Sequence, residues 1–169
     1  MAILQWVPDL DTGISEIDVQ HRRIVDYINR VNELRATHDR KGLEEVIAEM
    51  VDYTMSHFAF EEELMQNAGY MFTGPHKRVH EIFTRKVAEM QARFEGGEDV
   101  VEELHGMLSR WLFNHIRNED HGYIEAVKAY QKMAVKQHES EKEQLKMEVL
   151  RELAAERQRK GWLARLLGV

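Results

Sequence analysis

The chemically most informative residues of this sequence are histidines and carboxylates on helical faces that are otherwise apolar. They are His21, His57, Glu61, His76, His80, His115 and Asp120. An ionisable side chain buried in a core without a partner has a desolvation cost of several kcal/mol. Coordination of a cation would offset this cost for all seven side chains, so the sequence predicts a buried metal site.

Two pairs in this set have a spacing that suits a shared metal. His57 and Glu61 are four residues apart, as are His76 and His80. On an α-helix such residues differ by about 40° in direction and lie roughly 6 Å apart, so each pair can reach one ion. The spacing alone is a weak signal because most such pairs are solvated neighbours, but its position on apolar faces strengthens the prediction.

His115 and Asp120 are five residues apart, which separates them by about 140° on a regular helix. Both can face one centre if the helix ends or distorts between them, and Asn118 favours such a break. Glu119 lies at the regular spacing from His115 and is the competing ligand. The spacing alone does not choose between Glu119 and Asp120.

Helical patterns account for the positions of these side chains. After an extended arm over residues 1–14, Ser15 is expected to cap a first helix, with Asp18 three residues later. A second helix is expected from about Lys41 to Ala68, with Gly69 as its C-terminal stop. His21 lies in the apolar stripe of the first helix, and His57 and Glu61 lie in that of the second.

A third helix is expected to begin near Thr73, with Pro75 at its first position, and to end at the glycine pair of residues 96–97. A fourth helix follows directly and contains His115. Short connections between four helices favour an antiparallel up-down-up-down bundle, because such loops do not reach a parallel arrangement. The fold class is therefore all-α, with a C-terminal helical extension, and the site residues meet at the centre of the bundle.

Composition excludes several classes of protein. The 169-residue chain has a formal net charge of -7, which argues against a broad nucleic-acid interface. It has no cysteine, so disulfides, thiolate zinc sites and iron–sulfur clusters are excluded, and imidazole and carboxylate are the available ligands. No signal peptide and no run of about 18 apolar residues is evident, so we expect a cytoplasmic protein.

The ordered motifs resemble the hemerythrin family. His21 is followed by HFAFE at 57–61, HKRVH at 76–80 and HIRNED at 115–120, which is similar to the family pattern H…HxxxE…HxxxH…HxxxxD. The likeness extends over about residues 1–130 and is closest to the single-domain bacterial hemerythrins. The family comparison, unlike the spacing alone, favours Asp120 over Glu119 as a ligand.

The resemblance implies a non-haem di-iron centre. It places His76, His80 and His115 on one iron and His21 and His57 on the other. Glu61, Asp120 and an oxo or hydroxo group would bridge the two ions. Two six-coordinate ions offer about 12 positions, and this ligand set leaves one of them open, on the iron held by His21 and His57.

The resemblance also implies a dry O₂ pocket. The residues at the family's pocket positions are Ile24, Phe58, Trp111, Leu112 and Ile116. Taken singly, each is explained as well by core packing, since every bundle helix needs such residues. Either interpretation predicts that water is excluded from the site.

The favoured function is reversible O₂ binding without enzymatic turnover, for oxygen storage, delivery or sensing. The alternative is a di-iron enzyme or scavenger that acts on nitric oxide, peroxide or ferrous iron. Histidine-rich ligation favours the carrier, because oxygen-activating sites in bundles are usually rich in carboxylates. His105 lies three residues after Glu102, a spacing used by ferritin-like oxidases, but such sites need a second copy of that motif.

The expected domains are a bundle over residues 1–132 and a charged amphipathic helical tail over residues 133–169. Leu145, Val149, Leu150, Leu153 and Ala154 form a narrow stripe on the tail, with acidic residues first and basic residues last. Sustained heptads are absent, which argues against a long coiled coil.

The tail is expected to contact a protein partner or a second copy of the chain, or to dock on the bundle of its own chain. Its last segment, residues 161–169, carries Trp162, Leu163, Leu166 and Leu167 beside basic residues. Contact of this segment with a membrane surface is the less favoured alternative.

Overall fold

The computed structural model describes residues 3–167, and of the side chains from residue 161 onward only that of Trp162. Within this range the chain is helical and contains no strand. Its elements are η1 (Pro8–Leu10), α1 (Ser15–Ala36), α2 (Arg40–Asn67), α3 (Thr73–Glu95), α4 (Val101–Asn118), η2 (Asp120–Gly122) and α5 (Ile124–Leu167). The chain divides into two compact units, residues 1–128 and 129–169.

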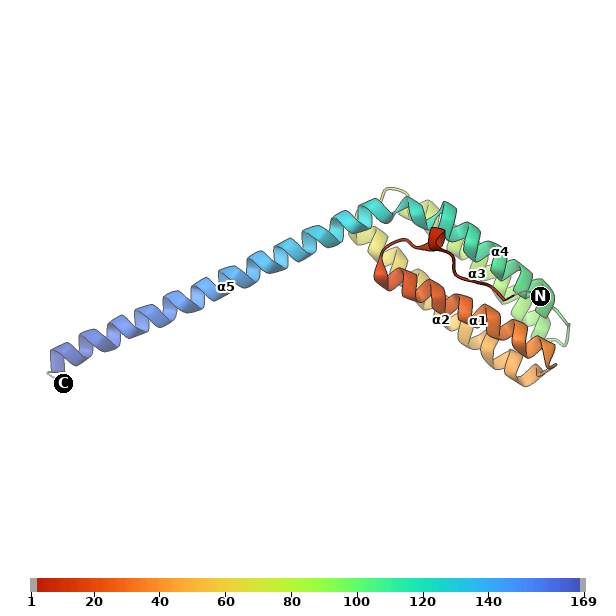
Figure 1. The fold of residues 1–169 in the computed structure, drawn as a ribbon, viewed down its shortest axis with the longest axis horizontal. Coiled ribbons are helices and arrows are strands. Elements are labelled where there is room, and N and C mark those ends of the chain that lie inside the picture. Colours follow the sequence, from red (N-terminus) through yellow and green to blue (C-terminus); the bar gives the residue numbers. More distant parts are fainter. Residues whose placement is uncertain (1–2, 168–169) are drawn as a thin grey trace. The chain divides into compact units, whose positions relative to one another are not determined.

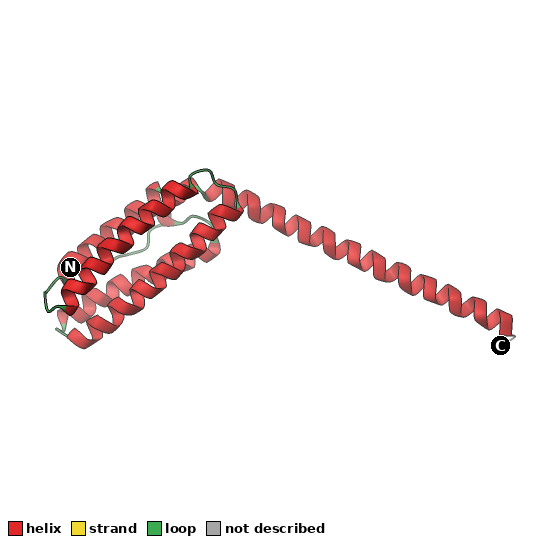
Figure 2. Cartoon of the chain, turned by 180° about the vertical axis from the view of Figure 1, so that it is seen from behind, coloured by secondary structure: helices red, strands yellow, loops and turns green. Residues whose placement is uncertain are grey.

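The first unit is an antiparallel four-helix bundle. Helices α1 to α4 run alternately up and down, and the N-terminal arm lies along the bundle (Figure 1). Helix α1 packs against α2 and α4, and α3 packs against the same two helices. Short loops connect successive helices (Figure 2). The predicted fold class is confirmed.

Apolar stripes drive the association of these helices. One core cluster runs through the bundle and includes Ile28, Val46, Phe83 and Leu104, all buried. A smaller cluster at the end of the bundle near α5 joins Ile14, Ile17, Met65, Tyr123 and Val127. Burial of each such side chain contributes about 1.5–3 kcal/mol. The site side chains lie on these same inward faces.

The helix ends follow the predicted glycine signals. Gly69 has φ +66° and Gly97 has φ +99°, values that side-chain-bearing residues rarely adopt. Helices α2 and α3 therefore stop close to the expected positions. Pro75 is the third residue of α3 rather than the first.

The start of α1 differs from the prediction. Ile14 is the N-cap residue and makes no side-chain capping bond, so Ser15 is the first helical residue and not the cap. The Asp18 carboxylate instead accepts hydrogen bonds from the backbone N–H groups of Thr12 (2.8 Å) and Gly13 (3.0 Å). Asp18 thereby fixes the arm against the first turn of α1, directly before the turn that carries His21.

The second unit consists of the part of α5 beyond Lys128. From Ala129 to Lys160 every side chain except that of Gln131 is exposed. Trp162 is also exposed, whereas the side chains of Leu163, Leu166 and Leu167 lie outside the described residues. The domain boundary expected at residues 132/133 falls within this helix and stays a prediction.

Among the residues that the structure describes, no helix combines the length and apolar character needed to cross a bilayer. The cytoplasmic location stays a prediction.

Candidate metal centre

The structure brings the seven predicted side chains together inside the bundle. They come from α1 (His21), α2 (His57, Glu61), α3 (His76, His80), α4 (His115) and η2 (Asp120). Each is at most 3% exposed. Five separate elements thus direct imidazoles and carboxylates into one dry volume.

Three histidines form one group. The Nε2 atom of His80 lies 3.1 Å from that of His76 and 3.0 Å from that of His115. Two ligand atoms at about 2.1 Å from one ion, in directions at right angles, are about 3.0 Å from each other. Both distances from His80 therefore match the separation that a single ion requires, and the ligand atoms of the three histidines lie within 4.8 Å of one another.

The other two histidines form a second group around Glu61. The rings of His21 and His57 have centroids 4.7 Å apart. Their Nε2 atoms lie 3.7 and 3.6 Å from the carboxylate oxygens of Glu61. His57 and Glu61 are one turn apart on α2, as their spacing predicts.

The two carboxylates lie between these groups. Oδ1 of Asp120 is 3.0 Å from Nε2 of His115, while Oδ2 is 3.3 Å from Nε2 of His21. Glu61 likewise faces His21 through Oε1 and His80, at 3.4 Å, through Oε2. Each carboxylate therefore contacts histidines of both groups, as a ligand shared by two ions would.

The end of α4 explains how Asp120 reaches the site. The helix ends at Asn118, and Asp120 begins the 3-10 turn η2. The expected interruption between His115 and Asp120 is therefore present. Asp120 is fully buried beside His21 and His115, whereas Glu119 is only half-buried.

Among the described residues, several polar atoms of the site have no hydrogen-bond partner. They are both ring nitrogens of His21, Nδ1 of His115, Oε2 of Glu61 and both carboxylate oxygens of Asp120. Buried polar atoms normally have partners, and each orphan costs about 1–3 kcal/mol. Atoms of this kind in a cluster of imidazoles and carboxylates fit cation binding.

The protonation states also suit a cation. Burial lowers the pKa of His21 from 6.5 to about 3, and it lowers the pKa values of His57 and His115 as well. These imidazoles are neutral, as metal ligands must be. Burial alone would raise the pKa of Glu61, but His57 and the other surrounding histidines bring it well below its usual value.

Comparison with known proteins decides the family. The profile of the Hemerythrin HHE cation binding domain matches residues 12–127. This chain belongs to the hemerythrin family. It is 54% identical over 140 residues to a bacteriohemerythrin of Stenotrophomonas maltophilia, covering 83% of this chain and 92% of that protein.

Other relatives agree. A bacteriohemerythrin of Pseudomonas aeruginosa is 56% identical over 128 residues, covering 76% of this chain and 84% of that protein. The solved structure of a wild-type hemerythrin superposes with a TM-score of 0.71 at 29% identity, covering 75% of this chain and 98% of that one. The predicted family is confirmed.

The hemerythrin domain holds two of its histidines through outer partners that the sequence analysis did not identify. Nδ1 of His57 lies 2.8 Å from Oε1 of Gln20, and Nδ1 of His80 lies 3.2 Å from Oε1 of Glu62. Lys77 in turn donates to Glu62 at 2.8 Å. Such partners fix the tautomer and direction of a ligating imidazole, so that Nε2 faces the centre.

Tyr123 is a third residue that the sequence analysis missed. Its side chain is fully buried, and its hydroxyl donates to Oε1 of Glu61. Burial and the neighbouring carboxylates raise the pKa of Tyr123 well above its usual value, so the phenol stays protonated. The only sequence signal was its position three residues after Asp120, where the turn η2 brings it back to the site.

Four of the five predicted pocket residues are buried, and Trp111 is half-buried. The Phe58 ring stacks on that of His80 at 3.8 Å, and Trp111 stacks on His115 at 4.2 Å. The two aromatic side chains therefore cover the three-histidine group. Ile24, Leu112 and Ile116 belong to the large core cluster. The role of all five in O₂ binding stays a prediction.

His105 is buried on α4, and its ring nitrogens have no hydrogen-bond partner among the described residues. Burial lowers its pKa. It belongs to neither group of potential ligands, and the structure gives it no part in the site.

Proposed function

We propose that this hemerythrin-family protein binds O₂ reversibly at a non-haem di-iron centre. The observation that carries the proposal is the buried set of five imidazoles and two carboxylates, with orphaned polar atoms and the spacing that two ions require. Relatives named bacteriohemerythrin and myohemerythrin support it.

The proposed ligand sets follow the two groups. His76, His80 and His115 would hold one ion, and His21 and His57 the other. Glu61 and Asp120 would be shared, together with an oxo or hydroxo bridge. When bound, the ferrous iron pair would supply the electrons that O₂ accepts on binding and that are returned when O₂ leaves.

The protein's own residues keep this chemistry reversible. Phe58 and Leu112 exclude water from the interior, and a dry site disfavours proton delivery to a reduced ligand. Tyr123 is a buried O–H donor at the site, but its proton is held in the hydrogen bond to Glu61. Each neutral imidazole provides one lone pair, and its remaining N–H is a far weaker acid than an imidazolium, so it does not protonate a bound ligand.

The proposal is tested by metal analysis and rapid mixing. Aerobically purified protein should contain an iron pair and show a dinuclear absorption spectrum. The reduced protein, mixed with O₂ in a stopped-flow instrument and then deoxygenated, should return to the colourless ferrous form. Rapid irreversible oxidation would instead support the enzymatic alternative, and a substoichiometric iron content would contradict both.

Storage, delivery and sensing share this reversible step. Sensing alone requires that another part of the chain or a partner respond to the state of the site. The tail of residues 133–169 is the segment in which we would look for such a response.

A further inference from the structure

The tail carries an apolar seam on a helix whose described side chains are almost all exposed. Leu145, Val149 and Leu153 follow one another at intervals of four on α5 and are between 47% and 63% exposed. In proteins most helical stability comes from packing an apolar face against another element rather than from helix propensity. The seam therefore requires a partner.

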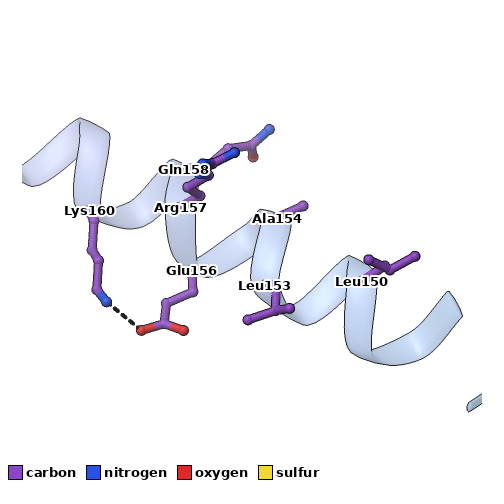
Figure 3. Close-up of a pocket in the computed structure, with 7 residues that line it drawn as sticks. All are labelled: Leu150, Leu153, Ala154, Glu156, Arg157, Gln158 and Lys160. Carbon is purple, nitrogen blue, oxygen red and sulfur yellow. Dashed lines mark ion pairs between the residues drawn. The ribbon is translucent and has the colours of Figure 1, made fainter. Parts of the chain in front are cut away.

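Charged residues border this seam at both ends. Lys142 lies three residues before Leu145, and Glu156 lies three residues after Leu153. Both positions are seven residues from Val149 and point within about 20° of it on a regular helix, so they continue the seam. In Figure 3, Leu153, Glu156 and Lys160 project from one flank of α5, and Glu156 pairs with Lys160 at 2.8 Å.

We propose that two copies of this chain associate through an antiparallel pairing of their α5 helices, centred on Val149. With the two-fold axis at this residue, Leu145 packs on the partner's Leu153 and Val149 on the partner's Val149. Lys142 then faces the partner's Glu156. The same contacts recur on the other side of the axis, as an isologous interface requires.

The charge distribution along the helix is self-complementary in this orientation only. Residues 138–148 contain four glutamates and two lysines, a net charge of −2. Residues 150–160 contain four basic residues and two glutamates, a net charge of +2. Antiparallel pairing places the acidic segment of one copy against the basic segment of the other. Parallel pairing places the two acidic segments together and the two basic segments together. Charge therefore selects a second, inverted copy as the occupant of the seam.

The association is tested by sedimentation equilibrium of the full-length, metal-loaded protein between micromolar and submillimolar concentrations. We expect a reversible dimer that Val149→Asp weakens at least about 10-fold, which corresponds to about 1.4 kcal/mol. Met147→Asp is the matched control, because Met147 is similarly exposed but points about 160° away from Val149. A wild-type protein that stays monomeric, or equal effects of the two substitutions, would overturn the proposal.

The orientation is tested by charge exchange. Lys142→Glu and Glu156→Lys should each weaken the dimer several-fold, because each creates two pairs of like charges across the axis. The double variant should restore the wild-type affinity. If the double variant is as weak as the single variants, the antiparallel register is wrong.

Distance measurement provides an independent test. The chain has no cysteine, so Ser140→Cys introduces a single site for a spin label. Antiparallel pairing about Val149 separates the two labelled residues by 18 helical positions, or about 27 Å, whereas parallel pairing brings them to about the interhelical distance of 8–10 Å. The protein could instead sediment as a monomer, remain helical by circular dichroism and be captured by phosphatidylglycerol vesicles. That combined result would assign the seam to a membrane surface and overturn the proposal.

Discussion

At the scale of single residues, the two groups of histidines differ in their outer partners. His57 is oriented by the neutral amide of Gln20, whereas His80 is oriented by the carboxylate of Glu62. A carboxylate makes an imidazole more electron-rich than an amide does, and outer partners typically affect metal affinity 10–100-fold. The structure therefore predicts that the two ions experience different ligand strengths.

Glu62→Gln should weaken iron binding by about 10-fold and raise the reduction potential of the loaded site, because His80 loses a strong acceptor. Competition with a chelator measures the first effect and redox titration the second. Glu63→Gln is the control, since Glu63 is the exposed neighbour. Lys77→Met tests whether the effect arises from the ion pair of Glu62. If Glu62→Gln changes the iron affinity and the reduction potential no more than Glu63→Gln does, Glu62 does not orient His80.

Tyr123→Phe should lower the free energy of unfolding of the metal-free protein by about 2 kcal/mol, because it leaves a buried oxygen of Glu61 without its donor. Urea titration measures this difference. Tyr130→Phe provides the comparison, since Tyr130 is exposed on α5. Similar midpoints for the two variants would show that the hydroxyl of Tyr123 contributes little.

The low pKa values of the buried histidines predict an acid-labile metal-free protein. His21, His57 and His115 are neutral when folded but take up protons when unfolded below pH 6.5. The unfolded state then binds more protons, so stability falls as the pH falls below about 6.5, by up to about 1.4 kcal/mol per pH unit for each histidine; for His21 the window extends down to about pH 3.

Asp120 changes the stability with pH in the opposite direction. Burial raises its pKa, so its contribution is complete below 3.8 and is lost as the pH rises through the higher value of the folded state. The lowered pKa values of the three histidines and of Glu61 all act against this one raised carboxyl, so we expect stability to rise with pH. Urea titrations of the chelated protein from pH 4 to 7 should therefore show rising stability, with a smaller slope for His21→Leu. If the stability of the wild-type protein does not change with pH, the lowered pKa values of the buried histidines are contradicted.

At the scale of elements, the site depends on where helices stop. The sequence predicted the helices, their apolar faces and the pairs on α2 and α3, because helical periodicity is a local property. It did not predict that Thr12 and Gly13 bind Asp18, nor that Gln20 and Glu62 bind histidines of other helices. Those contacts join residues whose proximity depends on how the helices pack together.

The break after Asn118 makes a prediction about neighbouring carboxylates. Asp120→Asn should lower iron affinity by more than about 100-fold, since it removes a charged oxygen from between the two histidine groups, whereas loss of an outer partner costs less. Glu119→Gln, one residue away, should retain the full iron content. Iron analysis after dialysis against a chelator distinguishes them. Equal losses would mean that the turn η2 rearranges when metal binds.

At the scale of the whole molecule, the chain consists of two units with different sources of stability. The unit of residues 1–128 has two apolar clusters and the candidate metal centre, whereas the described residues beyond 128 present exposed side chains on a single helix. A metal stabilises the segments whose folding creates its site. The gain in stability on metal binding should therefore be confined to the first unit, unless the tail changes its structure when the metal binds.

Hydrogen exchange with and without iron tests this separation. Metal at about 100 times its dissociation constant adds about 2.7 kcal/mol to the stability of the unit that binds it, so amides that exchange by global unfolding should slow roughly 100-fold within residues 1–128. Exchange over residues 129–160 should not change at constant protein concentration. A storage or delivery protein requires only this stabilisation of the unit that binds the metal. Protection that spreads into the tail on metal or O₂ binding would contradict independent units and would identify the tail as the element through which a sensor reports, because a ligand shifts only those equilibria for which it has differential affinity.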